Sequence, residues 1–115
     1  MCAAEAKLPM EIDCQTVKGW IDAGEKFLLL DCREPDEHAT AKIDAARLIP
    51  MGELLSKAAE LEAFKEGPVV VHCHRGGRSL KVTHWLRQNG FDKAQSLAGG
   101  IDRWAQEIEP GLARY

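Results

Sequence analysis

The sequence contains no long apolar run. No segment of the 115 residues approaches the roughly 20 apolar residues that a membrane-spanning helix needs, so we expect no membrane span. Residues 1–14 also lack a basic stretch followed by an apolar core, which does not fit a secretory signal peptide. The expected location is therefore cytoplasmic.

The chain also has little excess charge and few cysteines. Its net charge is −3 with the histidines neutral, so nothing drives the whole molecule toward nucleic acid or an anionic membrane. We therefore expect neither as a partner, and any basic binding site must be local. Four cysteines occur, at positions 2, 14, 32 and 73, with no C-x2-C pair. We expect no disulfide framework in a cytoplasmic chain of this kind.

The composition that is present is typical of one globular domain. Hydrophobic residues make up 45% of the chain and charged residues 29%, and the length fits one compact domain. Such a domain buries enough surface to fold without disulfides or metals. We expect residues 1–8 to form a loose leader and residues 9–115 to form the domain.

Strand-like and helix-like segments alternate along the chain. Several strands are continuous apolar runs, which is typical of strands buried on both faces of a parallel sheet. Strands are expected over residues 10–13, 26–31, 45–50, 68–72 and 95–97. Helices are expected over residues 14–23, 33–39, 52–64 and 79–89 and from residue 101, with Asp13 and Gly24 capping the first. This order predicts an α/β domain with a central, mostly parallel sheet of about five strands flanked by helices.

One loop combines residue types that point to chemistry. Cys73 follows the most apolar strand, at the carboxyl end where parallel sheets bind ligands. The adjacent Gly76 and Gly77 permit left-handed backbone angles, so successive N–H groups can point inward as an anion-binding nest. A helix that begins at Ser79 adds its own free N–H groups and the positive end of its dipole.

The same loop carries charge that favours a thiolate. Arg75 and Arg78 lie two and five residues after Cys73. A cysteine at a helix N-terminus beside arginines can have its pKa lowered from about 8.5 to roughly 3.5–7.5. The residues therefore predict a nucleophilic Cys73 and an anionic or electron-rich substrate.

Two other interpretations of Cys73 stay open at this point. A free cysteine at a strand end is often a buried structural residue, which is the interpretation we favour for the other three cysteines. A metal site is the second, because His72, His74 and His84 supply ligand types. Consecutive strand residues point to opposite faces, so His72, Cys73 and His74 do not easily converge on one ion. We expect no metal.

Three segments together resemble the rhodanese, or sulfurtransferase, family. Asp31, Arg33 and Glu37 match the family's Asp-x-Arg-x-x-x-Glu segment. Residues 69–79 resemble its active-site strand and loop, and residues 96–104 resemble its Gly-Gly-x-x-x-Trp ending. The resemblance implies a three-layer rhodanese-like fold over nearly the whole chain.

The resemblance also implies sulfur transfer by double displacement. The Cys73 thiolate would take a sulfur from a small anionic donor such as thiosulfate, form a persulfide and pass the sulfur to cyanide, a thiol or a protein. Ser79 would support the site by capping the helix. Asp31 and Arg33 would support it at its rim or as an ion pair that braces the loop. No metal or organic cofactor is implied. The residues implied to bind substrate are His74, Arg75, Gly76, Gly77 and Arg78.

The length of the loop separates two branches of this fold. By resemblance, related phosphatases and arsenate reductases carry Cys-x5-Arg, whereas Cys73 and Arg78 form Cys-x4-Arg. The shorter loop favours sulfur transfer. A small cysteine phosphatase or arsenate reductase is one alternative, and a sulfur-carrying, sensing or binding module is another.

Two further segments bear on partners and on the shape of the site. Residues 99–115 resemble rhodanese modules fused to adenylyltransferases that load sulfur carriers, which implies a protein acceptor as a hypothesis. Residues 41–46 stand where the family usually has a Gly-His-Ile-Pro-Gly-Ala turn. We therefore expect a turn of different shape at this wall of the cleft.

Overall fold

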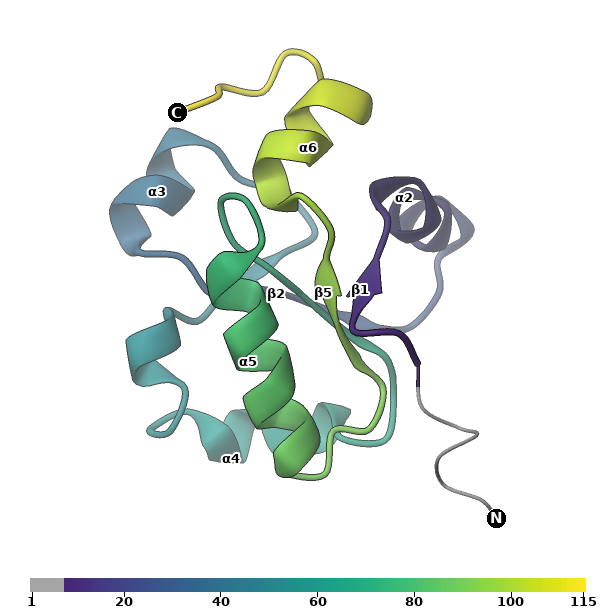
Figure 1. Cartoon of the computed structure of the whole chain (residues 1–115), viewed down its shortest axis with the longest axis vertical. Coiled ribbons are helices and arrows are strands. Elements are labelled where there is room, and N and C mark those ends of the chain that lie inside the picture. Colours follow the sequence, from purple (N-terminus) through teal and green to yellow (C-terminus); the bar gives the residue numbers. More distant parts are fainter. Residues whose placement is uncertain (1–7) are drawn as a thin grey trace.

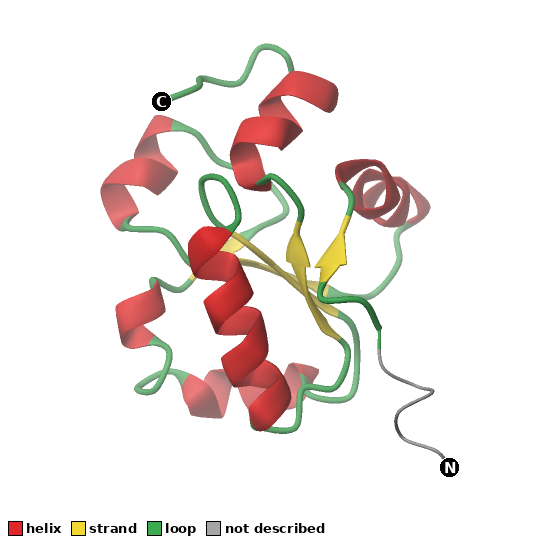
Figure 2. Ribbon diagram, viewed as in Figure 1, coloured by secondary structure: helices red, strands yellow, loops and turns green. Residues whose placement is uncertain are grey.

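The computed structural model describes residues 8–115, with a parallel sheet between two layers of helices (Figure 1, Figure 2). The strands are β1 (Glu11–Ile12), β2 (Leu28–Asp31), β3 (Arg47–Leu48), β4 (Val69–His72) and β5 (Ala94–Leu97). They lie in the order β1-β5-β4-β2-β3, and all neighbours are parallel. The predicted five-stranded α/β fold is confirmed. Of the expected leader, residues 1–7 lie outside the described residues.

Helices connect the successive strands. They are α2 (Cys14–Ala23), α3 (Pro35–Thr40), α4 (Ala58–Leu61), α5 (Gly77–Gln88) and α6 (Gly100–Glu107), with short 3-10 helices η1 (Met51–Glu53) and η2 (Glu62–Phe64). Within residues 8–115, none of these helices is long and apolar enough to cross a membrane.

The apolar strands contribute to two cores, one on each face of the sheet. Val69 and Val71 of β4 belong to the core that includes Val82 and Leu86 of α5. Val70 belongs to the opposite core, which α2 and α6 cover. Successive strand side chains point to opposite faces, so a continuous apolar run is what a doubly covered strand requires. Figure 1 shows α5 in front of the strands.

The predicted helix over residues 52–64 is wrong. This stretch forms η1, α4 and η2, separated by turns. Within it, the N–H groups of Leu54, Ala58 and Glu60 donate to the carbonyls three residues earlier, at 3.4, 3.3 and 3.0 Å, which is the pattern of 3-10 turns rather than of a continuous α-helix. Leu55, which helical spacing assigns to the inner face, is 78% exposed.

The helix α2 has its predicted bounds but not its predicted side-chain cap, and α5 begins earlier than predicted. Asp13 precedes α2 as an N-cap, but its side chain makes no capping hydrogen bond and instead accepts one from the Thr16 hydroxyl. Gly24 does end α2, with a left-handed φ of 71°. The helix expected from Ser79 begins earlier, at Gly77, and this earlier start brings its first turn to Cys73.

Candidate active site

Cys73 lies directly after β4, at the start of the loop that leads into α5. Its side chain is only 1% exposed. Gly76 has a φ of 117° and donates its N–H to Cys73 Sγ at 3.1 Å. The Ser79 N–H donates to the same sulfur at 3.4 Å. The loop thus turns backbone donors toward a buried sulfur atom.

The two glycines of the loop differ in conformation. Left-handed angles were expected at both, but only Gly76 has a positive φ. Gly77 is the first residue of α5, and a Cβ at this position would meet no atom within 4 Å. The turn that forms the nest therefore depends on Gly76, whereas Gly77 is not required there by its backbone angles.

Hydrogen bonds lower the pKa of Cys73. Burial raises the pKa of this thiol, but the Ser79 hydroxyl and three backbone N–H groups of the loop outweigh burial and hold the pKa below its ordinary value. The three N–H groups belong to Ser79, Gly76 and Arg78. Burial raises the pKa of Cys32 to about 12 and that of Cys14 to about 11. Of the three described cysteines, Cys73 is the one that the fold favours as a thiolate.

The Ser79 side chain is fixed beside Cys73. Its hydroxyl oxygen lies 3.4 Å from Cys73 Sγ and 3.1 Å from the Gly76 carbonyl oxygen. The Ser96 hydroxyl of β5 lies 2.7 Å from it. Ser79 is fully buried, so these contacts hold a polar group against the sulfur where water is excluded.

The start of α6 holds the opposite side of the loop. The Ile101 N–H donates to the Cys73 carbonyl at 2.9 Å, and the Asp102 N–H donates to the His74 carbonyl at 3.0 Å. The first N–H groups of a helix have no partner within the helix, so they are available for such contacts. The carbonyls of Cys73 and His74 therefore accept hydrogen bonds from α6, while the Gly76 N–H of the loop donates to Cys73 Sγ.

Arg78 is engaged by an acidic partner. Its guanidinium forms a bidentate ion pair with Glu37 of α3, at 2.7 Å and 2.9 Å. The hydrogen bonds from Arg78 lower the pKa of Glu37 to about 2. Arg75 is exposed to solvent. Glu37 thus neutralises the charge of Arg78, one of the two arginines that we expected to attract an anionic substrate.

Asp31 and Arg33 form an ion pair in the interior, and both side chains are 0% exposed. Arg33 Nε and Nη2 donate to the Asp31 carboxylate at 2.9 Å and 2.8 Å, and Nη2 also donates to the Ala41 carbonyl at 2.6 Å. Burial raises the pKa of Asp31, but the hydrogen bonds from Arg33 and neighbouring histidines lower it to about 2. The pair braces the segment after β2 from within and is not exposed at a rim.

Two contacts near these charges were not predicted. His38 Nδ1 lies 3.0 Å from the Asp31 carboxylate. The Tyr115 hydroxyl accepts a hydrogen bond from Arg33 at 2.8 Å and donates one to Glu37 at 2.9 Å. The family motif included Glu37 but did not indicate which residue it contacts, and no sequence signal pointed to Tyr115.

The segment that replaces the family's usual turn packs into the core. Ala41 and Ile43 are buried with α2 and α6, at 5% and 2% exposure. The Ala46 N–H donates to the Ile43 carbonyl at 2.9 Å and closes the turn. Alanines therefore stand where the family has its two glycines, and the exposed Lys42 and Asp44 stand where it has histidine and proline.

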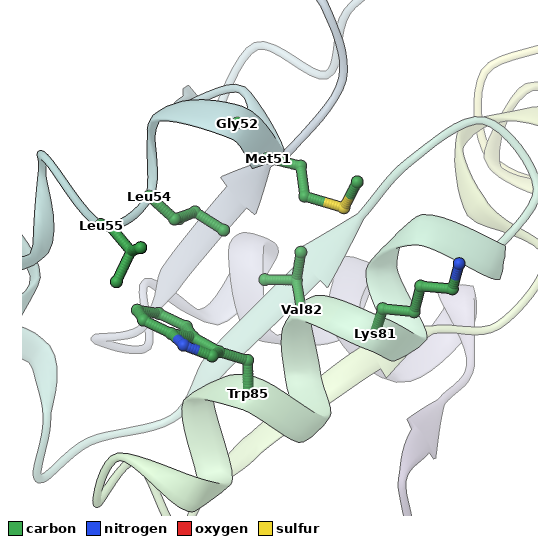
Figure 3. Close-up of a pocket in the computed structure, with 7 residues that line it drawn as sticks. All are labelled: Met51, Gly52, Leu54, Leu55, Lys81, Val82 and Trp85. Carbon is green, nitrogen blue, oxygen red and sulfur yellow. The ribbon is translucent and has the colours of Figure 1, made fainter.

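A cavity of about 410 Å³ lies between η1 and the first half of α5 (Figure 3). Met51 and Leu54 line it on one side, and Val82 and Trp85 line it on the other, with Lys81 toward one end.

The structure also bears on metal binding. Within residues 8–115, no three His, Cys, Asp or Glu side chains are grouped to hold an ion.

The fold and this loop together define a class of protein: an α/β domain with a thiolate-favouring cysteine held by N–H donors at the carboxyl edge of a parallel sheet. The chain belongs to the rhodanese family, because the family model of the Rhodanese-like domain matches residues 13–107. The family resemblance of the sequence is confirmed.

Individual relatives agree with this family. The chain is 32% identical to the probable adenylyltransferase/sulfurtransferase MoeZ of Mycobacterium tuberculosis, over 98% of this chain but only 29% of that protein. It is 33% identical to a sulfurtransferase of Allochromatium vinosum, over 90% of this chain and 94% of that protein. The human single-domain sulfurtransferase TSTD1 matches with a TM-score of 0.76 and 25% identity, over 87% of this chain and 98% of that one. The chain is thus of the rhodanese-like sulfurtransferase or sulfur-carrier type.

Proposed function

We propose that this protein is a sulfurtransferase that carries a sulfane sulfur as a persulfide on Cys73. The observation that supports it most is the pair of N–H donors on Cys73 Sγ, from Gly76 at 3.1 Å and Ser79 at 3.4 Å. Such donors stabilise a thiolate before reaction, and the same nest can stabilise the negative outer sulfur of a persulfide.

The proposed reaction has two displacement steps. In the first, the Cys73 thiolate attacks the outer sulfur of an anion such as thiosulfate. The sulfur–sulfur bond of the donor breaks, sulfite leaves with the electron pair, and Cys73 becomes a persulfide. In the second, cyanide, a thiolate or a protein thiol attacks the outer sulfur and the Cys73 thiolate is restored. Both steps balance without a metal or an organic cofactor.

The loop residues have proposed roles in binding the donor. The exposed Arg75 attracts the anion, since its charge lies in solvent beside the nest. Asp31 and Arg33 support the site as a buried pair rather than by contact with the donor. The loop residues proposed to bind the donor are His74, Arg75, Gly76, Gly77 and Arg78. We also keep the cytoplasm as the proposed location, because a reducing compartment maintains Cys73 as a thiol.

Two alternatives make different predictions. A phosphatase or arsenate reductase needs a loop that surrounds a tetrahedral anion, and the Cys-x4-Arg ring from Cys73 to Arg78 is one residue shorter than that family branch shows. A sulfur-carrier or sensing module forms the persulfide but does not pass it to small acceptors. The low exposure of Cys73, 1%, is the observation that favours this second alternative.

Thiosulfate and cyanide test the proposal directly. Exposure to thiosulfate should add one sulfur atom to the Cys73 peptide, measured by mass spectrometry, and cyanide should remove it as thiocyanate. Cys73→Ser should abolish both. Cys14→Ala is the matched control, since Cys14 is also buried but has a raised pKa, and it should keep both reactions.

Each alternative has its own result in this experiment. A persulfide that forms on Cys73 but does not react with cyanide points to the carrier. Turnover of an aryl phosphate above sulfur transfer points to the phosphatase. Full thiocyanate formation by Cys73→Ser contradicts the proposal itself.

A further inference from the structure

Tyr115 joins two ion pairs that lie beside the Cys73 loop. Its hydroxyl accepts from Arg33 Nη1 at 2.8 Å and donates to Glu37 Oε2 at 2.9 Å. Arg33 is paired with Asp31, and Glu37 is paired with Arg78. One phenol oxygen thus connects the buried pair behind β2 to the partly buried pair at the end of the loop.

The ring of Tyr115 makes a separate contact with the loop. It stacks on His74 with the ring centroids 4.0 Å apart and an angle of 10° between the planes. His74 directly follows Cys73. Figure 1 shows the C-terminal end of the chain beside α3, the helix that contains Glu37. The ring of Tyr115 therefore contacts the loop, and its hydroxyl contacts the two ion pairs.

These contacts reach both ends of the loop. His74 is the residue after Cys73, and its ring is covered by Tyr115. Arg78 lies in the first turn of α5, directly after the loop, and Glu37 holds its side chain while the Arg78 N–H helps to lower the pKa of Cys73. Fixing both ends limits how far the N–H groups can move away from Sγ.

We propose that Tyr115 is a positioning residue for Cys73: by stacking on His74 and tying Glu37 to Arg33, it keeps the N–H groups of the loop aimed at Sγ. The role is indirect, since the contacts of Tyr115 are with His74, Arg33 and Glu37 and not with the sulfur. Its consequence for sulfur transfer rests on the proposed function, whereas its effect on the thiolate does not.

The protonated phenol is the form that this role needs. Glu37 is a carboxylate that accepts, so the phenol must donate to it. Burial raises the pKa of Tyr115 and Glu37 acts in the same direction, while Arg33 opposes them; overall the pKa is raised. The hydroxyl therefore stays protonated at neutral pH and keeps both hydrogen bonds.

Two substitutions separate the ring from the hydroxyl. Tyr115→Phe keeps the stack on His74 and loses both hydrogen bonds, whereas Tyr115→Ala loses all three contacts. The readout is the pH profile of iodoacetamide alkylation, followed on the Cys73 peptide by mass spectrometry so that other cysteines do not contribute. The midpoint should rise by about one pH unit in Tyr115→Ala, close to the effect of losing one N–H donor to the thiolate, and by about half a unit in Tyr115→Phe, which keeps the stack on His74.

Arg114→Gln is the matched control. Arg114 is the neighbour of Tyr115 and pairs with Asp102 at 3.0 Å, a surface pair whose loss costs little. This variant should keep the wild-type midpoint, and thermal unfolding should show all three variants folded. A wild-type midpoint in both Tyr115 variants overturns the proposal, as does an equal shift in Arg114→Gln.

Activity is the second readout. Because a higher pKa leaves a smaller fraction of Cys73 ionised, kcat/KM for sulfur transfer from thiosulfate should fall about tenfold in Tyr115→Ala at a pH below the alkylation midpoint. If the wild-type protein transfers no sulfur but the Tyr115 variants still shift the alkylation midpoint, the proposed function fails and the positioning role stands. If transfer is normal in all variants and the midpoint does not move, only the positioning role fails.

Discussion

At the scale of single residues, the chemistry of this protein depends on how Cys73 is kept as a thiolate inside the fold. Burial alone works against the charged form, as Cys14 and Cys32 show by their raised pKa values. Each hydrogen bond to a charged group contributes about 1.5–3 kcal/mol, so a few donors suffice to outweigh burial. Gly76 and Ser79 supply these donors within a few residues of the sulfur.

Ser79 provides a prediction at this scale. Ser79→Ala removes the hydroxyl that lies 3.4 Å from Cys73 Sγ but keeps the Ser79 N–H. The pKa of Cys73 should therefore rise by about one unit, measured as the midpoint of its alkylation profile. Ser96→Ala is the control, because the Ser96 hydroxyl bonds to that of Ser79. An equal shift in the two variants contradicts a direct effect of the Ser79 hydroxyl.

At the scale of elements, two helix starts meet at one loop. The first turn of α5 donates toward Cys73 Sγ, and the first turn of α6 donates to the carbonyls of Cys73 and His74. The first turn of α5 therefore holds the Cys73 side chain, and the first turn of α6 holds the backbone carbonyls of Cys73 and His74. Close approach of α6 is possible because Gly100 lacks a side chain there: a Cβ would lie 2.5 Å from the His74 carbonyl oxygen.

Gly100→Ala tests this approach. The substitution puts a methyl group against two loop carbonyls, at a φ of +60° that disfavours any side chain. The free energy of unfolding, measured with urea, should fall by about 2 kcal/mol or more. Gly77→Ala is the control, because a Cβ there meets nothing within 4 Å and φ is not positive; its change should stay within about 0.5 kcal/mol. Equal stability of the two variants contradicts this account.

The sequence predicted the features that depend on residues close together in the chain and missed those that depend on contacts between distant residues. The strands β2 and β4 and the nest around Cys73 depend on residues close together in the chain, so local patterns were enough. The prediction of a helix over residues 52–64 failed because apolar spacing does not distinguish a continuous α-helix from short 3-10 turns, in which N–H groups bond to the carbonyl three residues earlier. The contacts of Tyr115 span 78 and 82 residues, and no local pattern encodes them.

At the scale of the whole molecule, charged side chains tie together segments that are distant in the chain. The Glu37–Arg78 pair joins α3 to α5, and Tyr115 links this pair to the buried Asp31–Arg33 pair at the end of β2. Hydrogen bonds from the arginines lower the pKa of Asp31 and of Glu37 to about 2 in both cases. The folded state therefore keeps these carboxylates ionised, and their contribution to stability is lost only when the pH falls below the range in which unfolded acids protonate, near pH 4.

His72 extends this dependence on pH to a higher range. Its side chain at the end of β4 is fully buried, and burial lowers its pKa from 6.5 to about 4. The unfolded chain protonates this histidine first, so stability is full above about pH 6.5 and is lost as the pH falls toward 4. The free energy of unfolding should drop by about 2 kcal/mol between about pH 7 and pH 4.5.

His72→Asn removes the titrating group and isolates this effect. The variant should be less stable than the wild type at neutral pH, because a buried side chain is replaced, but its stability should change much less between about pH 7 and pH 4.5. His84→Gln, at an exposed histidine, should keep the wild-type dependence. Urea unfolding at several pH values measures all three proteins. Because the carboxylates act at lower pH, a wild-type slope in His72→Asn would mean that another group causes the loss of stability.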